Sequence, residues 1–195
     1  MIRRPGPTAH PRIAAFVEEC RRAELAQAET ADIVLAVAPA LLALLAHTKE
    51  FLLPEHYRRV SGRYGRNVVY VSPDGGVSLF TLIWEPGQWT PVHDHGTWGV
   101  VAVLDGVLEE RNYIRVDGHR DVTDGIQLCR GGVTLLAPGT VTTFVPNPDH
   151  IHVTGVPPTR GPAVSLHLYG REMNNYNVYD VNAGTRRLID VAYEV

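Results

Sequence analysis

Residues 98–114 have the sequence WGVVAVLDGVLEERNYI, in which two apolar runs rich in branched side chains flank Asp105-Gly106. Valine and isoleucine favour strands because their branched side chains pack well on a pleated surface. An Asp-Gly pair between two such runs is a strong signal for a two-residue hairpin turn. The segment therefore predicts two strands, at 98–104 and 107–114, joined by a tight turn.

Similar short strands are expected on both sides of this segment. They lie at 67–72, 77–84, 133–137, 141–145, 151–156 and 163–169. Glycine and proline pairs such as Pro138-Gly139 mark turns between them. Many short strands at regular spacing are typical of a sandwich or barrel, not of a parallel sheet with crossover helices. We predict an all-β core, most simply a small double-stranded β-helix, or jelly roll.

The beginning of the chain has a helical pattern instead. Four apolar side chains share one helix face: Ile13, Phe16, Val17 and Cys20. A second helix is expected from about residue 30, and Pro39 should end it or begin a new one, because proline has no N–H to donate. We expect residues 1–60 to form a helical extension that covers one end of a sheet. Residues 61–195 should form the barrel, in one compact unit with the extension.

The composition of the chain excludes several classes of protein. Its 195 residues, 45% hydrophobic and 20% charged, suit one ordinary globular domain rather than a disordered chain or a coiled coil. A net charge of -3 gives no reason to expect nucleic acid or an anionic membrane as a partner. Two cysteines are too few for a disulfide scaffold. Together with the lack of an N-terminal signal pattern, they lead us to expect a cytoplasmic protein.

The segment from Gly87 to His95 ends in two histidines that flank an aspartate, His93-Asp94-His95. Residues two apart on a strand point to the same face, so the imidazoles would project together and Asp94 the other way. Two imidazoles on one face provide half of a metal site. A pair of histidines without a metal is the alternative, but the turn before the pair and Gly106 after it favour the metal.

A third metal ligand should come from a neighbouring strand. His150 and His152 lie two residues apart, so both could face inward, and His167 is another candidate. Spacing alone leaves these three histidines open.

His167 belongs to a run in which polar residues alternate with Leu166 and Leu168. Ser165, His167 and Tyr169 would then share one face of a strand. A strand with one solvent-exposed face is one interpretation. The other is a hydrogen-bonded row that aims the tyrosine hydroxyl at a functional site.

These motifs resemble those of the cupins, since residues 87–106 have a glycine, five residues, HxH and a later glycine. Within the cupins, the chain from about Tyr64 to Tyr169 is similar to the thiol dioxygenases of the cysteine dioxygenase type I family. The resemblance rests on Tyr64-Gly65-Arg66-Asn67, Trp84, residues 91–95, His152 and the row of Ser165, His167 and Tyr169.

The resemblance implies one Fe(2+) with three histidine ligands: His93, His95 and His152. The third ligand is His152 rather than His150, because His152 lies thirteen residues before Ser165, as in the family. Most cupins have a glutamate ligand shortly after HxH, but residues 96–100 contain no carboxylate, which favours a neutral site. Three neutral imidazoles leave the full charge of the iron to favour the thiolate form of a substrate. The catalytic residues implied are Tyr169, His167 and Ser165.

Animal cysteine dioxygenases have a cysteine after HxH that forms a thioether with the active-site tyrosine. The matching position here is Gly99, or Val100 if the alignment shifts by one residue. The chain therefore resembles the bacterial members, which work without the crosslink and include both cysteine and 3-mercaptopropionate dioxygenases. We expect Tyr169 to be unmodified.

Arg66 stands where cysteine dioxygenases have the arginine that binds the substrate carboxylate, and where many 3-mercaptopropionate enzymes have glutamine. The guanidinium fork suits a carboxylate because its donors match the two oxygens. Tyr64 is expected to bind the substrate as well. Arg171, just after Tyr169, is an alternative carboxylate clamp.

The expected function is the oxidation of L-cysteine, or a closely related small thiol carboxylate, by O2 to the sulfinic acid. One alternative is a 3-mercaptopropionate or mercaptosuccinate dioxygenase. Another, from a different class, is a non-catalytic metal-binding cupin that acts as a sensor or structural module. The expected partners are the small thiol and O2, without nucleic acid or membrane, and the oligomeric state stays open, a monomer included.

Overall fold

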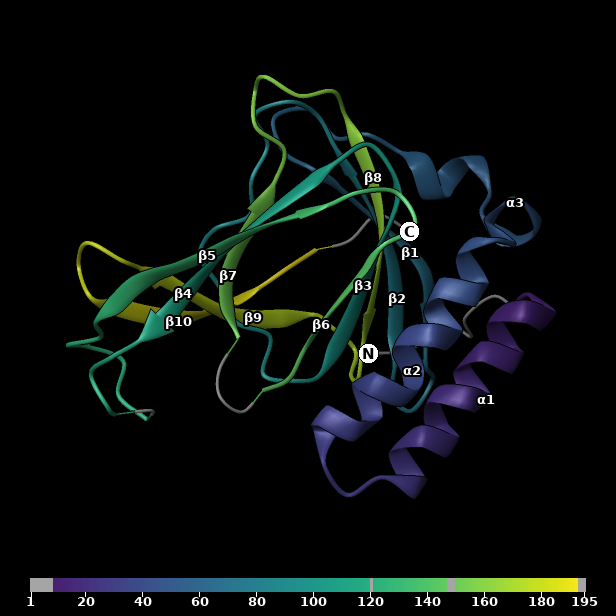
Figure 1. The fold of residues 1–195 in the computed structure, drawn as a ribbon, viewed down its shortest axis with the longest axis horizontal. Coiled ribbons are helices and arrows are strands. Elements are labelled where there is room, and N and C mark those ends of the chain that lie inside the picture. The colour runs from purple at the N-terminus through teal and green to yellow at the C-terminus, as the bar shows by residue number, and fades with distance from the viewer. Residues whose placement is uncertain (1–8, 120, 147–149, 193–195) are drawn as a thin grey trace.

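The computed structural model describes residues 9–119, 121–146 and 150–192. Helices come first in the chain and strands follow (Figure 1). The helices are α1 (Pro11–Ala26), α2 (Thr30–Leu45), α3 (Thr48–Phe51) and the 3-10 helix η1 (Pro54–Tyr57). The strands are β1 (Gly65–Val71), β2 (Ser78–Trp84), β3 (Gly99–Asp105), β4 (Leu108–Arg115), β5 (Leu128–Leu136), β6 (Val141–Phe144), β7 (Ile151–Gly155), β8 (Ala163–Tyr169), β9 (Asn175–Asp180) and β10 (Thr185–Asp190). None of the described helices has the length and apolar character needed to cross a bilayer.

Two facing layers of antiparallel strands form the double-stranded β-helix, which confirms the predicted fold class. One layer is a five-stranded sheet with the order β1-β2-β8-β3-β6. The other contains β5-β4-β7 and the β9–β10 hairpin. His93 joins these two parts, because its backbone bridges His152 of β7 on one side and Val178 of β9 on the other. His93 was expected to lie on a regular strand. In the described structure it takes part only in isolated β-bridges within this second layer.

The predicted hairpin at Asp105-Gly106 is wrong. β3 pairs with β8 and β6, whereas β4 pairs with β5 and β7, so this turn carries the chain from one layer to the other. Gly106 has a φ of +71°, and a Cβ there would lie 2.2 Å from the carbonyl oxygen of Pro162. Glycine is therefore required because the backbone of Pro162 comes close to this turn between the layers. An Asp-Gly pair fits such a turn as well as a hairpin turn, so the sequence does not distinguish the two.

Helices α1 and α2 cover the outer face of the five-stranded sheet, rather than one end of a sheet as expected (Figure 1). The predicted face of α1 is buried there. It packs in one apolar cluster with outward-facing side chains such as Val100 of β3 and Leu166 and Leu168 of β8. Because strand residues alternate, the neighbours of these leucines on β8 point to the interior of the barrel.

Pro39 does not interrupt α2, which runs from Thr30 to Leu45. The hydrogen bond that proline cannot donate would go to the carbonyl of Leu35, four residues earlier. Leu35 is 69% exposed, so water can satisfy that carbonyl. Meanwhile Val37 and Leu41, on either side of Pro39, stay buried against the sheet. The free energy gained by burying this continuous apolar face outweighs the cost of the hydrogen bond that Pro39 cannot donate, so the helix continues.

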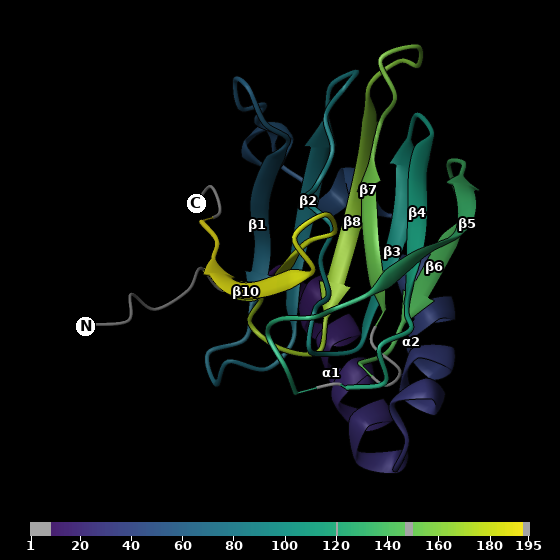
Figure 2. The same ribbon diagram turned by 90° about the vertical axis from the view of Figure 1, so that its left-hand side faces the viewer.

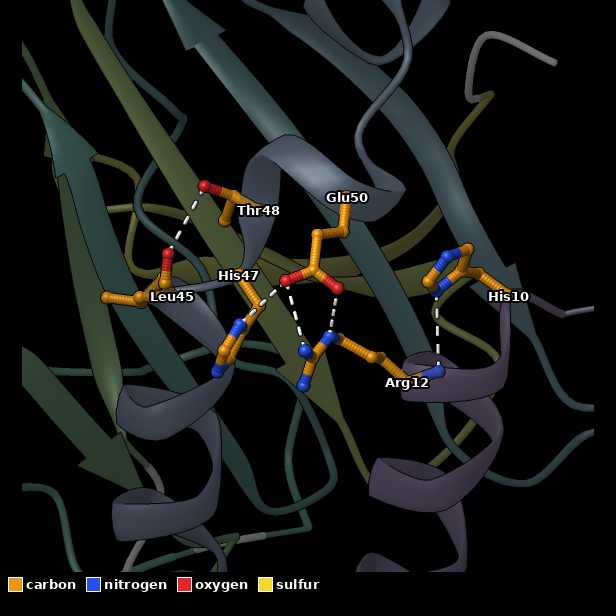
Figure 3. Close-up of polar contacts among 6 residues, drawn as sticks. All are labelled: His10, Arg12, Leu45, His47, Thr48 and Glu50. Carbon is orange, nitrogen blue, oxygen red and sulfur yellow. Dashed lines mark hydrogen bonds and ion pairs between the residues drawn. The ribbon is translucent and has the colours of Figure 1, made fainter.

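A polar contact ties the start of α1 to α3 at the outer edge of the helical layer (Figure 3). The guanidinium of Arg12 donates to both carboxylate oxygens of Glu50, and His47 lies 2.9 Å from the same carboxylate. The hydrogen bonds from Arg12 and His47 hold the pKa of Glu50 below its ordinary value. Since all three side chains are solvent-exposed, we expect this contact to orient the helices more than to stabilise them.

The strands β9 and β10 were not predicted from the sequence. They form a hairpin on the side of the barrel away from α1 and α2 (Figure 1 and Figure 2). The described part of the helical region ends near residue 57 and the strands begin at residue 65. The proposed boundary near residue 60 stays a prediction, and residues 1–8 of the expected extension lie outside the described part of the chain.

Candidate functional site

Three buried histidines converge at the inner face of the second layer. The ring centroids of His93 and His95 are 4.7 Å apart, and that of His152 lies 4.6 Å from the first and 5.0 Å from the second. One nitrogen from each ring lies within 4.8 Å of the others, which suits binding to a single metal ion. Backbone hydrogen bonds in both directions between His93 and His152 hold the two strands together at this point.

The protonation of these rings fits a metal centre. Nδ1 of His93 lies 3.0 Å from the carbonyl oxygen of Pro91, so it carries hydrogen and leaves the lone pair of Nε2 for a metal. Both ring nitrogens of His152, and Nδ1 of His95, are buried without a hydrogen-bond partner in the described structure. Burial, reinforced by the neighbouring histidines, lowers the pKa of His93 and of His95 well below the ordinary value. Neutral imidazoles with free nitrogens are suited to iron or another transition metal.

The other two candidate ligands have different surroundings. Nε2 of His150 lies 3.0 Å from Oδ1 of Asn112, an acceptor, so this nitrogen carries hydrogen. His167 faces the interior, but Nε2 and Nδ1 of its ring are bonded to Ser165 and Tyr169. Of the histidines left open by spacing, the structure therefore brings His152 together with the pair His93 and His95.

A row of hydrogen bonds leads to the tyrosine hydroxyl. Nε1 of Trp84 lies 2.9 Å from Oγ of Ser165, which lies 2.8 Å from Nε2 of His167. Nδ1 of His167 lies 3.3 Å from the hydroxyl oxygen of Tyr169. The polar face of β8 thus points inward and not to solvent, because the helices cover the opposite face.

The donors and acceptors of this row give it a direction. The indole N–H of Trp84 can only donate, so the hydroxyl hydrogen of Ser165 is left for Nε2 of His167. The histidine must then carry its hydrogen on Nδ1 and donate it to the oxygen of Tyr169. The hydrogen of the tyrosine hydroxyl remains for an acceptor in the cavity. Burial raises the pKa of Tyr169, which keeps this hydrogen in place.

The histidines, the tyrosine and an arginine line one cavity inside the barrel. Its lining consists of Tyr64, Arg66, Leu82, Thr90, His93, His95, Val101, His152, Thr154, His167, Tyr169, Met173 and Tyr176. Arg66 is 5% exposed and lies over the ring of Phe80, with Cζ 4.0 Å from the ring centroid, while Nη2 donates to the carbonyl oxygen of Met173. Tyr64 stacks on Trp84, with ring centroids 4.6 Å apart.

Arg171, the alternative clamp, does not line this cavity. Its guanidinium donates to the backbone carbonyl oxygens of His95, Glu172 and Asn175. An arginine whose fork is bonded to three carbonyls positions backbone rather than a ligand. The structure therefore leaves Arg66 as the arginine beside the histidines.

Tyr176, on β9, also lines the cavity and was not predicted from the sequence. Its ring is 5.0 Å from that of His93, and burial raises the pKa of its hydroxyl, which also bonds to Tyr64. Asp94 holds β9 in place, because its carboxylate accepts hydrogen bonds from Asn177 and, at 2.6 Å, from the hydroxyl of Tyr179. The signal was the alternation in NYNVYD at 175–180, which separates Tyr176 from these two residues on the opposite face.

A second missed residue is Glu110, on β4. Its carboxylate oxygens lie 3.1 Å from Nδ1 of His152 and 3.5 Å from Nε2 of His150. Burial would raise the pKa of Glu110, but its hydrogen bonds with the two histidines lower the pKa overall. The carboxylate ligand of most cupins would fall at residues 96–100, whereas Glu110 comes from the strand that follows the turn at Gly106.

Gly99, one of the two positions expected to match the crosslinking cysteine, has no room for a side chain. A Cβ there would lie 2.1 Å from Cζ of Phe144. Val100 packs against the helices on the outer face, and neither cysteine is near the tyrosine by its position, since Cys20 is in α1 and Cys129 is exposed on β5. The ring of Phe144 thus takes the space beside Gly99.

Comparison with known proteins gives one family and several similar folds. The family model described as "Cysteine dioxygenase type I" matches residues 54–182. A solved structure from Klebsiella pneumoniae, an uncharacterized protein with a double-stranded β-helix domain, is 20% identical, covers 72% of this chain and 96% of its own, and has a TM-score of 0.44. A cupin-like protein from Thermotoga maritima is 16% identical, with 69% and 85% coverage and a TM-score of 0.41.

Proposed function

The chain belongs to the cysteine dioxygenase type I family, and from this we propose that it is an iron-dependent thiol dioxygenase that oxidises L-cysteine. The observation that carries the proposal is the convergence, in one cavity, of three neutral histidines, the hydroxyl of Tyr169 and the guanidinium of Arg66. In the reaction, a thiolate and O2 combine to give a sulfinate, so that both oxygen atoms of O2 end on sulfur.

His93, His95 and His152 would hold the iron. A bound ferrous ion supplies a Lewis acid that favours the thiolate form of the substrate, together with the redox chemistry that O2 requires. Three protein ligands would leave coordination positions on the metal for the substrate and for O2. The absence of a carboxylate among the three leaves the charge of the metal uncompensated by its ligands.

The remaining cavity residues would orient the substrate. Arg66 is suited to bind the carboxylate through its fork, and its stacking on Phe80 limits the motion of the guanidinium. Tyr64 and Tyr176 would close the cavity beside it and exclude water. Tyr169, with its hydroxyl hydrogen directed into the cavity, would donate a hydrogen bond to the substrate or to the oxygen that adds to sulfur.

The charges of the cavity favour a substrate with one carboxylate. Among the described residues that line it, Arg66 is the single cationic side chain. Arg171, which could have bound a second carboxylate, is bonded to backbone carbonyls. Mercaptosuccinate would bring two carboxylates against one cation, and burying the unpaired one would be costly.

Oxygen uptake by iron-loaded protein with a panel of thiols tests the proposal. We expect kcat/KM to be highest for L-cysteine and much lower for mercaptosuccinate and for cysteamine, which has no carboxylate. A preference for 3-mercaptopropionate would mean that this thiol, and not L-cysteine, is the substrate of the same oxidation. Iron binding without uptake for any thiol would contradict the proposal and favour a metal-binding module without catalysis.

A further inference from the structure

We propose that Glu110 is a positioning residue of the metal centre, which accepts hydrogen from Nδ1 of His152 and so presents Nε2 of that ring to the metal. This inference rests on the metal site of the proposed function and extends it to a residue outside the three ligands. Glu110 comes from β4, in the same layer as β7, which carries His152.

The strand register brings the two side chains together. In the β4–β7 pair, Asn112 lies opposite His152 and Glu110 lies opposite Thr154. Glu110 is therefore a diagonal neighbour of His152 on the inner face, within reach of a long side chain. Oε2 of Glu110 lies 3.1 Å from Nδ1 of His152, and both side chains are nearly fully buried.

The surroundings of Glu110 differ from those of an ordinary ion pair. Its neighbour Glu109 pairs with Arg111 at 2.7 Å on the other face of the strand. In the described part of the chain, the carboxylate of Glu110 lies beside two imidazoles, those of His150 and His152. A buried carboxylate needs hydrogen-bond donors, and because Nε2 of His150 donates to Asn112, we expect the N–H of His152 to face Glu110.

This arrangement assigns opposite roles to the two nitrogens of His152. Both ring nitrogens are buried without a hydrogen bond in the described structure, and Oε2 of Glu110 lies 3.1 Å from Nδ1. We infer that Nδ1 carries the hydrogen, facing the carboxylate, and that Nε2 keeps its lone pair for the metal. A carboxylate behind a ligating imidazole fixes the ring orientation and increases its basicity. In a centre of three neutral ligands, this contact would bring negative charge close to the metal without occupying a coordination position.

Glu110, His150 and His152 could instead form a second metal site, because their ligand atoms also lie within 4.8 Å of one another. Nε2 of His150, the nitrogen 3.5 Å from Glu110, already donates to Asn112, so Nδ1 of that ring, which is buried without a hydrogen-bond partner among the described residues, is the nitrogen left for a metal there. Both sites need a nitrogen of His152, and a metal bound with His93 and His95 through Nε2 leaves Nδ1 of His152 for Glu110. We therefore infer that Glu110 orients a ligand and is not one itself.

Anaerobic titration of apoprotein with Fe(II) tests the inference, with wild type, Glu110→Gln and the matched control Glu109→Gln. Glu110→Gln should weaken iron binding by about 10- to 100-fold, the usual effect of losing such a partner. Glu109→Gln should bind as wild type does. The Co(II)-loaded Glu110→Gln protein should keep the coordination number of the wild type in its visible spectrum.

Equal iron affinity for wild type and Glu110→Gln would overturn the inference. Loss of a metal ligand in the Co(II) spectrum of Glu110→Gln, with metal still bound by His93→Ala, would overturn it in favour of the second site. A wild type that binds no iron would instead refute the proposed function, so the two failures are distinguishable.

A measurement on the wild-type apoprotein covers the case in which Glu110→Gln does not fold. The 15N chemical shifts of the histidine side chains report which ring nitrogen carries hydrogen, and His152→Gln identifies the signals of His152. We expect hydrogen on Nδ1 of His152. Hydrogen on Nε2 would contradict the inference.

Discussion

The ring of Phe144 stacks on the ring of His95, with centroids 4.0 Å apart and planes at 21°. Phe144 also fills the space in front of Gly99, where a Cβ would meet its ring at 2.1 Å. An aromatic side chain thus supports a proposed metal ligand and fills the space beside Gly99.

Gly99→Ala should therefore destabilise the protein, because the added methyl must displace Phe144. Overpacking of this kind costs about 1–3 kcal/mol. Urea denaturation of the apoprotein measures the change. The matched control is Gly132→Ala on β5, where a Cβ meets nothing within 4 Å, and it should change stability by no more than about 0.5 kcal/mol. Equal effects of the two substitutions would contradict the role given to Phe144.

Arg66→Ala should lower kcat/KM for L-cysteine by removing a charged hydrogen-bonding partner from a buried cavity. Loss of such a partner costs roughly 2–4 kcal/mol, or about 30-fold to several hundred-fold in kcat/KM. The loss for cysteamine should be much smaller, because that thiol has no carboxylate. Arg111→Ala is the control, because the guanidinium of Arg111 stacks on the ring of Trp89 and does not line the cavity. This variant should keep the activity of the wild type. Equal losses of activity for the two thiols, with iron content unchanged, would exclude Arg66 as the clamp.

Ser165→Ala should lower kcat more than it changes iron content. It leaves Nε2 of His167 without a donor, so the hydrogen can move from Nδ1 and the hydroxyl of Tyr169 is no longer oriented. A lost buried hydrogen bond of about 1–3 kcal/mol corresponds to roughly 5- to 150-fold in rate. Ser72→Ala, another buried serine outside the cavity, is the control and should retain activity. Unchanged kcat for Ser165→Ala would remove the row from the mechanism.

The apoprotein should lose stability as the pH falls below the ordinary pKa of histidine. Burial, with His152 and Arg66 nearby, lowers the pKa of His167 to about 3. Below pH 6.5 the unfolded chain therefore binds a proton that the folded protein does not, so unfolding becomes more favourable down to about pH 3. The loss from this residue is about 1.4 kcal/mol at pH 5.5 relative to pH 7.5.

Urea denaturation of apoprotein at both pH values measures this effect. His167→Gln should show a smaller pH dependence than wild type by that amount. An identical pH dependence for wild type and His167→Gln would show that folding does not lower the pKa of His167.

Strand alternation was enough to predict that Ser165, His167 and Tyr169 share a face, because that property is local. Which way the face points depends on the helices that cover Leu166 and Leu168, a long-range fact that no spacing within the strand contains. The layer change after β3 was missed for the same reason, since Asp-Gly favours a sharp turn without specifying which strands pair.

The residues of the candidate site also fall into two groups, those predicted from local spacing and those that were not. His93 and His95 could be predicted together from a separation of two residues. Tyr176 and Glu110 come from β9 and β4, and they reach the site through strand pairing within the second layer, β4 with β7 and β9 with the backbone at His93. Their contribution depends on tertiary contacts, so the sequence pattern around the histidines did not indicate them.

Product analysis after reaction of iron-loaded protein with L-cysteine under 18O2 tests the proposed reaction directly. We expect cysteine sulfinic acid with both sulfinate oxygens labelled. His152→Gln should lose this product together with its iron, and His47→Gln should keep both. Absence of labelled sulfinate from iron-loaded wild type, or a sulfinate oxygen derived from water, would contradict the proposed dioxygenase activity.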